Sequence, residues 1–396
     1  MRTLLLSLLL LAMPVTVFPQ KAFRPVKAAM KAKNYKEVLN LVTKLREDSV
    51  YQNHPKLCIY SIEAQRGLND AENMKLYLKR SYDTIAFFST THQIIREAVK
   101  LDSIERALQQ TENKKPKQTH LVSEMLRLYF PNLNAATRFY YKKRKFNEAM
   151  DYLRTCLDLP HTTLGEEVKL SAKNDTVNAV LYLTSAYNLK QYKEVHRYEP
   201  LALLNAKTRL SVVDCLVRTA DAENDTATYR KWLTYGWDNY PQQPLFFTRL
   251  IDYYVKQNNY QHIVDLAKVQ LGNDSTDASA LLAQCLAYLN LNNLDECIHS
   301  GIRLLQVDST NVDANYYIGA SYVSKALQVV LPDNPSKESY RQARAQQKAY
   351  YIKAEPFLER YRALAPQSKN RWAPLLYKVY LALNKGKKFA EIEKLL

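Results

Sequence analysis

Cys285 and Cys297 are the residues whose types and spacing come closest to a chemical function. Both fall where the two helices of one expected helix pair pass closest to each other. That proximity suits the geometry of a disulfide bond. An oxidising compartment would permit the bond, whereas two small buried thiols that allow close packing fit the same positions. The sequence leaves both interpretations open.

No other group of residues has the pattern of a catalytic or metal site. The seven histidines are dispersed, and none pairs with a cysteine or serine in a known nucleophile setting. No CxxC pair occurs, and no histidine cluster lies near a cysteine, which argues against zinc. The 7 glycines form neither a P-loop nor a dinucleotide fingerprint. We therefore expect no enzyme activity, no cofactor and no metal.

The chain is strongly basic, with a formal net charge of +17, which favours anionic partners. Its densest basic run is Lys142, Lys143, Arg144 and Lys145, at the expected end of one helix and in the turn that follows. Cations there complement the negative end of the helix dipole. With Arg138 they could equally form an anion-binding corner. Residues 143–145 are called the basic corner below.

Residues 1–20 resemble a secretory signal. Arg2 supplies the positive start, Leu4 to Met13 the apolar stretch, and Pro14 to Gln20 the exit region. An uncleaved anchor is the alternative, although the 16 residues from Thr3 to Phe18 fall short of a spanning helix, which needs about 20. No cysteine precedes Cys58, so a lipoprotein is not expected. We expect an exported protein, periplasmic or associated with the cell surface, and no nucleic-acid partner.

A 34-residue period organises residues 176–322. Tyr192, Thr226, Tyr260 and Leu294 recur at strict 34-residue steps, and several other positions keep the same step. Each unit carries two helical patterns. A period of this length with two helices per unit is the signature of a helical solenoid. The sequence therefore predicts an all-α fold.

These units resemble the tetratricopeptide repeat (TPR), a helix-turn-helix motif of 34 residues. The resemblance rests on a bulky residue early in helix A, an aromatic one later, and an aromatic one in the turn, as in Phe247, Tyr254 and Tyr260. The small residue that the family has in helix B is replaced by larger ones such as Tyr229 and Ile263, which predicts looser pairs. The resemblance implies a right-handed superhelical solenoid whose A helices line a concave groove.

The same resemblance implies a function. We expect a non-enzymatic interaction scaffold of the cell envelope that binds a peptide or partner protein in the groove of residues 130 to 325. The groove residues mix charges with tyrosines and lack the clamp of lysines and asparagines that some family members use for peptide carboxylates. They are Arg138, Tyr141, Lys142, Tyr187, Arg218, Asp252 and Tyr254.

The alternative is an envelope-associated module that binds an anion, either a lipid head group or a cell-wall polymer, through the basic corner of Lys143, Arg144 and Lys145. The two functions differ in salt dependence. Anion binding should weaken steeply with ionic strength, whereas a tyrosine-lined peptide groove should respond weakly.

The regularity of the pattern also suggests an organisation along the chain. After the signal we expect divergent helical repeats over 21–110, a basic loop and connecting helix over 111–130, and a TPR solenoid over 131–396. Insertions interrupt the solenoid near 161–174 and 325–346. In the N-terminal part we expect a helix from Pro55 to Arg66, closed by Gly67, and another that begins at Asp70. The interruptions are where we expect a particular partner to bind.

Overall fold

The computed structural model describes residues 19–113, 115–335 and 337–396. All regular structure in these ranges is helical. The signal expected over residues 1–20 lies outside the described residues except for its last two positions. Within the described ranges, no helix combines the length and the hydropathy that crossing a bilayer would require.

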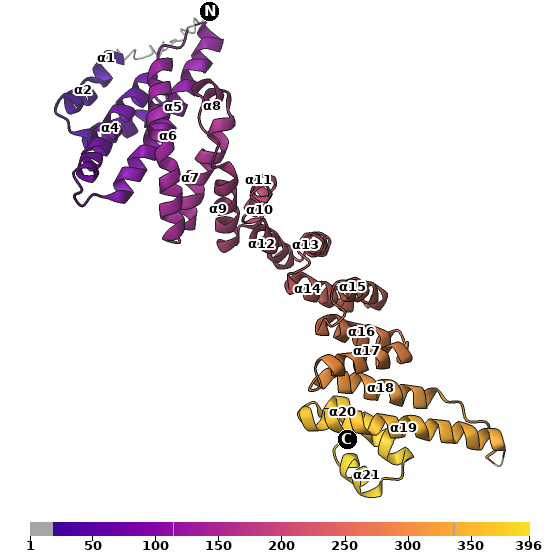
Figure 1. The fold of residues 1–396 in the computed structure, drawn as a ribbon. Coiled ribbons are helices and arrows are strands. Elements are labelled where there is room, and N and C mark those ends of the chain that lie inside the picture. The colour runs from indigo at the N-terminus through magenta and orange to yellow at the C-terminus, as the bar shows by residue number, and fades with distance from the viewer. Residues whose placement is uncertain (1–18, 114, 336) are drawn as a thin grey trace, which may run out of the picture. The chain divides into compact units, whose positions relative to one another are not determined.

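The chain divides into two compact units, residues 1–225 and 226–396, each described here by itself. Figure 1 labels the helices. In unit 1 they are α1 (Pro19–Ala22), α2 (Arg24–Lys31), α3 (Tyr35–Glu47), α4 (Pro55–Tyr77), α5 (Thr84–Glu112), α6 (Thr119–Lys142), α7 (Phe146–Asp158), the 3-10 turn η1 (Leu159–His161), α8 (Thr163–Val168), α9 (Asp175–Asn188), α10 (Tyr192–Val195), α11 (Glu199–Leu203) and α12 (Arg209–Ala222).

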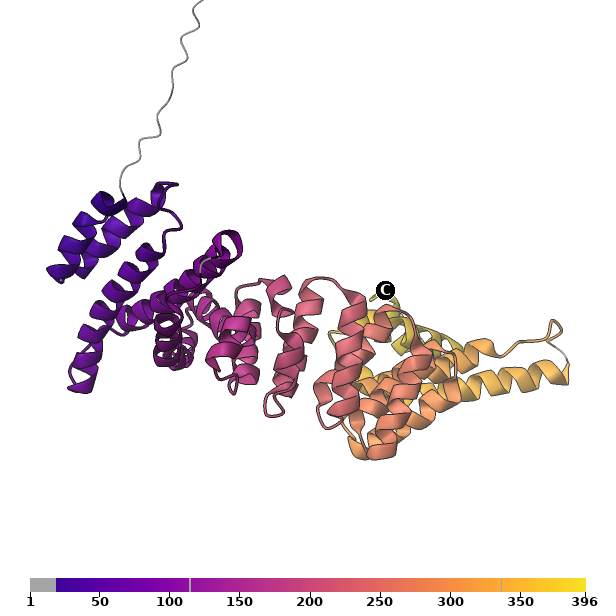
Figure 2. The same cartoon turned by 90° about the horizontal axis from the view of Figure 1, so that it is seen from above.

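Unit 2 also consists of consecutive helices in the described residues. Its helices are α13 (Thr226–Asn239), α14 (Pro244–Lys256), α15 (Tyr260–Asn273), α16 (Ala278–Asn290), α17 (Leu294–Val307), α18 (Val312–Gln328), α19 (Glu338–Leu364), α20 (Lys369–Ala382) and α21 (Gly386–Glu393). Figure 2 shows α18 and α19 side by side.

Each helix packs mainly on the helices next to it in the chain. In unit 1, α4 packs on α5, α5 on α6, and α6 on α7; in unit 2, α16 packs on α17, α17 on α18, and α18 on α19. The apolar cores follow this order, as with the cluster around Ile263, Cys285 and Cys297 between α15, α16 and α17. The predicted all-α helical solenoid is confirmed for the units described.

A left-handed residue ends the first helix of successive pairs. Lys190, Asn224, Asn258 and Asn292 have φ between 53° and 60°, and they recur at the 34-residue step. In each turn the next N–H donates back to a carbonyl in the preceding helix, at 2.8–2.9 Å. These bonds satisfy carbonyls that the helix end would otherwise leave unpaired. Arg144 adopts the same conformation between α6 and α7.

Replacing Lys190 with glycine should stabilise the protein, because glycine adopts a positive φ without the steric cost that a Cβ imposes. We expect Lys190→Gly to raise the free energy of unfolding by about 1 kcal/mol. Lys193→Gly, at an exposed helical position three residues away, is the matched control and should lower it by about 1 kcal/mol. Urea denaturation of both variants measures the two changes, and an equal loss in both would contradict the role of the turn.

Helix α4 corrects one prediction. The expected break at Gly67 does not occur, and α4 runs unbroken from Pro55 to Tyr77. Gly67 lies inside the helix against the ring of Tyr35, where an added Cβ would come within 2.3 Å of the ring. The absence of a side chain at Gly67 therefore allows the close approach of α3, and Gly67 does not end the helix. Asp70, expected to cap a new helix, lies within α4.

Two further helices differ from the periodic pattern. Helix α6 continues through Pro131, so the boundary drawn at residues 130 and 131 falls inside it. The second helix of the pair that begins at α9 is broken into α10 and α11, with Pro200 in the first turn of α11. Proline has no N–H, so it costs less in the first turn of a helix than in its interior. The position of Pro200 therefore favours the start of a new helix, α11.

The helices have the following bounds in the two segments where insertions were expected. Residues 161–174 contain α8 and the loop after it. Around residues 325–346, α18 overruns to Gln328, and α19 begins at Glu338 and passes through Pro356 as a single helix. The division at residues 225 and 226 lies within the stretch that was predicted as one continuous array.

His92 on α5 is a buried titratable group in unit 1. Its Nε2 lies 2.9 Å from the Thr155 hydroxyl on α7, and its Nδ1 lies 3.6 Å from the Asp151 carboxylate. Burial lowers the pKa of His92 to about 4, against an opposing effect of Asp151, while Arg96 lowers it further. The imidazole is therefore neutral in the fold at neutral pH.

Acid should destabilise unit 1 through this residue. Between pH 6.5 and about 4 the unfolded chain binds a proton at His92 that the folded chain does not, so stability falls as pH falls through that window. We expect a loss of about 2 kcal/mol between pH 7 and pH 5. Urea midpoints at the two values measure it, and His92→Gln should make the difference smaller. An unchanged difference in that variant would assign the acid sensitivity elsewhere.

Candidate functional site

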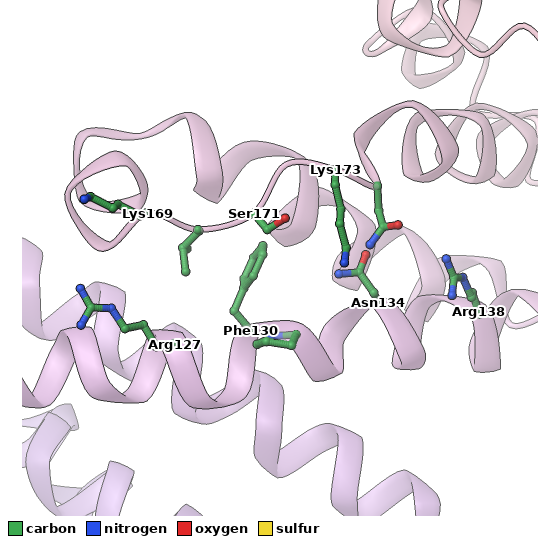
Figure 3. Close-up of a pocket in the computed structure, with 10 residues that line it drawn as sticks. Arg127, Phe130, Asn134, Arg138, Lys169, Ser171 and Lys173 are labelled. Atoms are coloured by element: carbon green, nitrogen blue, oxygen red, sulfur yellow. The ribbon is translucent and has the colours of Figure 1, made fainter.

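A cleft of about 550 Å³ lies in unit 1 between α6 and the end of the insertion. Four of its lining residues are cationic and none is acidic. The residues that line it are Arg127, Phe130, Pro131, Asn134, Arg138, Lys169, Leu170, Ser171, Lys173 and Asn174. Figure 3 shows Arg127 and Lys169 toward one end, Lys173, Asn134 and Arg138 toward the other, and Phe130 and Ser171 between them.

One face of α6 supplies half of the wall. Arg127, Phe130, Asn134 and Arg138 are spaced by three or four residues, so they lie along one stripe of the helix. The Asn134 side chain accepts a hydrogen bond from the buried Asn178 amide on α9, at 2.9 Å from Nδ2 to Oδ1. That bond leaves the amide N–H groups of Asn134 available to an acceptor in the cleft.

The insertion supplies the other half, and its fold is anchored at several points. The Thr162 hydroxyl caps α8 by accepting from the Gly165 N–H, at 3.1 Å. Gly165 sits so close to η1 that an added Cβ would lie 2.0 Å from the Leu159 carbonyl oxygen. After α8, Lys169 adopts φ 61° and turns the chain toward α6.

Side-chain contacts hold the insertion to the neighbouring helices, two of them near its ends. Arg127 Nε donates to the Val168 carbonyl at 3.3 Å and joins α6 to the end of α8. His161 Nε2 lies 2.6 Å from the Asp175 carboxylate and closes the base of the insertion against α9. The wall is therefore a folded segment rather than a loose loop.

The cationic groups of the cleft are not neutralised by the chain. Arg138, Lys169 and Lys173 are exposed, and within the described residues none of them forms an ion pair. Glu167 on α8 instead pairs with Arg106 on α5, at 2.5 Å. Like charges gathered in a concavity focus a positive potential that attracts anions.

The five predicted groove residues of unit 1 lie on neighbouring A helices. Arg138, Tyr141 and Lys142 are on α6, Tyr187 is on α9 and Arg218 is on α12, and α9 contacts both α6 and α12. One side-chain contact crosses between α6 and α9, where the Tyr141 hydroxyl lies 3.1 Å from the Thr184 hydroxyl. Tyr187 and Arg218 lie on α9 and α12, which pack on each other.

The charge of Arg218 is largely satisfied within its own helix. Its guanidinium lies 2.8 Å from the Asp214 carboxylate one turn earlier, and this hydrogen bond is the main reason that the pKa of Arg218 is raised. Of the cations predicted for the groove, Arg138 is the one that also lines the cleft.

The two predicted groove residues of unit 2 lie apart from those of unit 1 in the chain. Asp252 is exposed on α14. Tyr254 stacks on His262 of α15, with ring centroids 4.9 Å apart. Tyr254 therefore packs between the two helices of its own pair, and its substitution would disturb that pair as well as any groove.

The basic corner forms the turn between α6 and α7. Lys143 caps α6, Arg144 has the left-handed conformation, and Lys145 precedes α7 and lies 4.0 Å from Glu148. None of these three residues lines the cleft. Their place at the C-terminus of α6 fits the dipole interpretation.

Cys285 and Cys297 are free thiols in the structure. The expected proximity is present, because Cys297 Sγ lies 3.3 Å from the Cys285 carbonyl oxygen and Cys285 Sγ lies 3.8 Å from that of Cys297. The hydrogen bond with Cys297 and burial raise the pKa of the Cys285 thiol. Burial raises the pKa of Cys58 to about 11.

All five cysteines are buried thiols, so alkylation should depend on unfolding. We expect iodoacetamide at pH 8 to leave the native protein unmodified and to add five labels in denaturant without reductant. Intact mass counts the labels. Three labels in denaturant, rising to five after reduction, would establish a disulfide instead.

No group of three or more histidine, cysteine, aspartate or glutamate side chains that could hold a metal occurs among the described residues. Cleft residues that the sequence analysis did not identify are Arg127, Asn134, Lys169 and Lys173. The signal was available in the spacing of Arg127, Phe130, Asn134 and Arg138, but the boundary expected between residues 130 and 131 divided them.

Comparison with known proteins gives limited information. No family model matches the chain, and no curated protein matches it. Among solved structures it is similar to the TPR domain of P58(IPK), with 10% identity over 89% of this chain and 99% of that chain and a TM-score of 0.25. It is also similar to yeast Tom70, with 14% identity over 93% and 82% and a TM-score of 0.32.

A third similar structure is a human IFIT1 dimer with PPP-AAAA, with 12% identity over 93% of this chain and 87% of that chain and a TM-score of 0.27. At such identities and TM-scores the likeness says nothing about what this chain binds.

Proposed function

We propose that this protein is a non-enzymatic interaction scaffold that binds an extended segment of a partner protein along the A helices of unit 1. The observation that carries the proposal is that α9 packs on both α6 and α12, with the Tyr141 hydroxyl of α6 3.1 Å from the Thr184 hydroxyl of α9. Tyrosine offers a large apolar contact with a polar tip and few rotatable bonds, which suits a binding surface.

The proposal narrows the surface predicted from the sequence. It rests on helices of unit 1 alone, and it leaves out Tyr254, which packs between α14 and α15. It includes Lys142 and Tyr187, whose side chains are exposed and half-buried, respectively. Mixed charge and aromatic groups favour a partner that contributes both polar and apolar contacts.

We also propose that the protein is exported to the cell envelope. The charged start, apolar stretch and exit region of residues 1–20 support this proposal. Fractionation of cells that produce the full chain, followed by N-terminal sequencing, would test it. A mature chain that begins near Gln20 is the expected result, and retention of Met1 in the cytoplasm would contradict it.

The binding surface is tested by photocrosslinking in the producing cell. A photoreactive phenylalanine analogue in place of Tyr187 should give a discrete crosslinked partner. The same analogue in place of Tyr77, an exposed tyrosine of α4 that is 82% accessible, is the matched control and should not. In the purified complex, Tyr187→Ala should weaken binding of that partner about tenfold, because buried interface tyrosines often contribute more than 1 kcal/mol.

Identical crosslinks from both positions, or undiminished affinity in Tyr187→Ala with an unchanged thermal transition, would count against this surface. Tyr77→Ala in the same assay shows whether loss of any exposed tyrosine has an equal effect.

A further inference from the structure

We propose that the cleft between α6 and the insertion binds an acidic, extended segment of a partner protein, with its carboxylates about five residues apart. This inference rests on the proposed function in taking a protein segment as the ligand. It adds a second binding site, distinct from the A-helix surface, and it specifies the chemistry of the ligand that this site binds.

The charges of the cleft are placed at its two ends. Arg127 and Lys169 lie toward one end, and Lys173 and Arg138 toward the other (Figure 3). Arg127 and Arg138 are 11 residues apart on α6, which corresponds to about 16 Å along the helix axis at 1.5 Å per residue. An extended peptide covers that distance in about five residues at 3.3 Å each. A single small anion could contact only one end.

The middle of the cleft is not cationic. Phe130 lies there beside Ser171, and Pro131 and Leu170 are the other apolar residues of the lining. A polyphosphate or a nucleic-acid backbone would place negative charges against this apolar stretch, where no cation faces them. A peptide can place an uncharged, apolar side chain at the same point. The distribution of charge therefore favours a peptide.

The polar groups of the wall suit a peptide main chain, which offers both donors and acceptors. The amide N–H groups of Asn134 can donate to a carbonyl, because its Oδ1 is engaged by Asn178. Pro131 has no N–H to donate to the Arg127 carbonyl in the preceding turn, which leaves that oxygen without its helical partner at the cleft wall. A phosphate chain has no N–H that could donate to the Arg127 carbonyl oxygen.

The proposal is tested with the full chain and a fluorescein-labelled peptide, Glu-Glu-Gly-Leu-Gly-Glu-Glu, by fluorescence anisotropy. Its acidic pairs are about five residues apart. The matched control peptide, Glu-Glu-Glu-Glu-Gly-Leu-Gly, has the same composition and charge in one block. We expect the spaced peptide to bind about fivefold more tightly at low salt, and its affinity to fall steeply as salt rises. Equal affinities would overturn the two-ended arrangement.

The location is tested by a double variant with one change at each end, Lys169→Gln with Lys173→Gln. Both side chains are exposed, so the fold should be retained. We expect about tenfold weaker binding of the spaced peptide, since two charge contacts are lost. Lys143→Gln with Lys145→Gln removes the same charge from the basic corner and should leave the affinity nearly unchanged. Equal losses in the two double variants would show a non-specific effect of net charge.

Linear polyphosphate of matched charge distinguishes the ligand class. It should compete weakly with the spaced peptide, and competition at equal or lower concentration would assign the cleft to phosphate and overturn the proposal. The experiments can also reject either of the two proposals without rejecting the other. Loss of the crosslink at Tyr187 with cleft-dependent peptide binding retained would reject only the A-helix surface. A retained crosslink with no cleft-dependent binding would reject only this inference.

Discussion

The fold depends on how sharply the chain reverses between paired helices. At the turns of the regular array a single left-handed residue, followed by an N–H that bonds back into the helix just ended, completes the reversal. Because no longer loop intervenes, α15 packs back on α14, and α17 packs back on α16. The contacts within each unit are mainly between helices adjacent in the chain, and stability accumulates pair by pair.

The short turn within each helix pair also determines where an additional segment can be inserted into the array. A helix pair closed by a three-residue turn has no room for an added segment inside it, but the connection between pairs is free to lengthen. The insertion after α7 occupies such a connection. It folds as η1 and α8 and is held by Arg127 and Asp175 without displacing the packing of α7 on α9. The insertion is thus added to the solenoid without altering the packing of the periodic core.

The sequence predicted the features that periodicity governs. Spacing at 34 residues located the turns from Lys190 to Asn292, because each must supply the same backbone reversal at the same point of the unit. It also located both insertions as breaks in that spacing. A lengthened connection has no periodic template, so the fold of α8 and the direction of Lys169 and Lys173 depend on tertiary contacts that no local pattern encodes.

Two helix boundaries were predicted wrongly for a related reason. Gly67 is a residue type that often ends a helix, but its role is set by Tyr35 of another helix. A boundary was expected between residues 130 and 131, but α6 continues through Pro131 and packs on α5 and α7. That expected boundary divided the cleft stripe from Arg127 to Arg138. The candidate site was therefore predictable in its location but not in its residues.

The way the insertion is attached has a consequence for protein engineering. Its polar contacts with the solenoid are a guanidinium on a carbonyl at one end, an imidazole on a carboxylate at the other, and the ion pair of Arg106 with Glu167 between them, while Gly165 fixes its internal turn against η1. A segment with so few points of attachment is portable. Together with the four-residue stripe of α6 that faces it, it could be transplanted between helix pairs of an idealised repeat array, which would then acquire a charged recess without any change to its core.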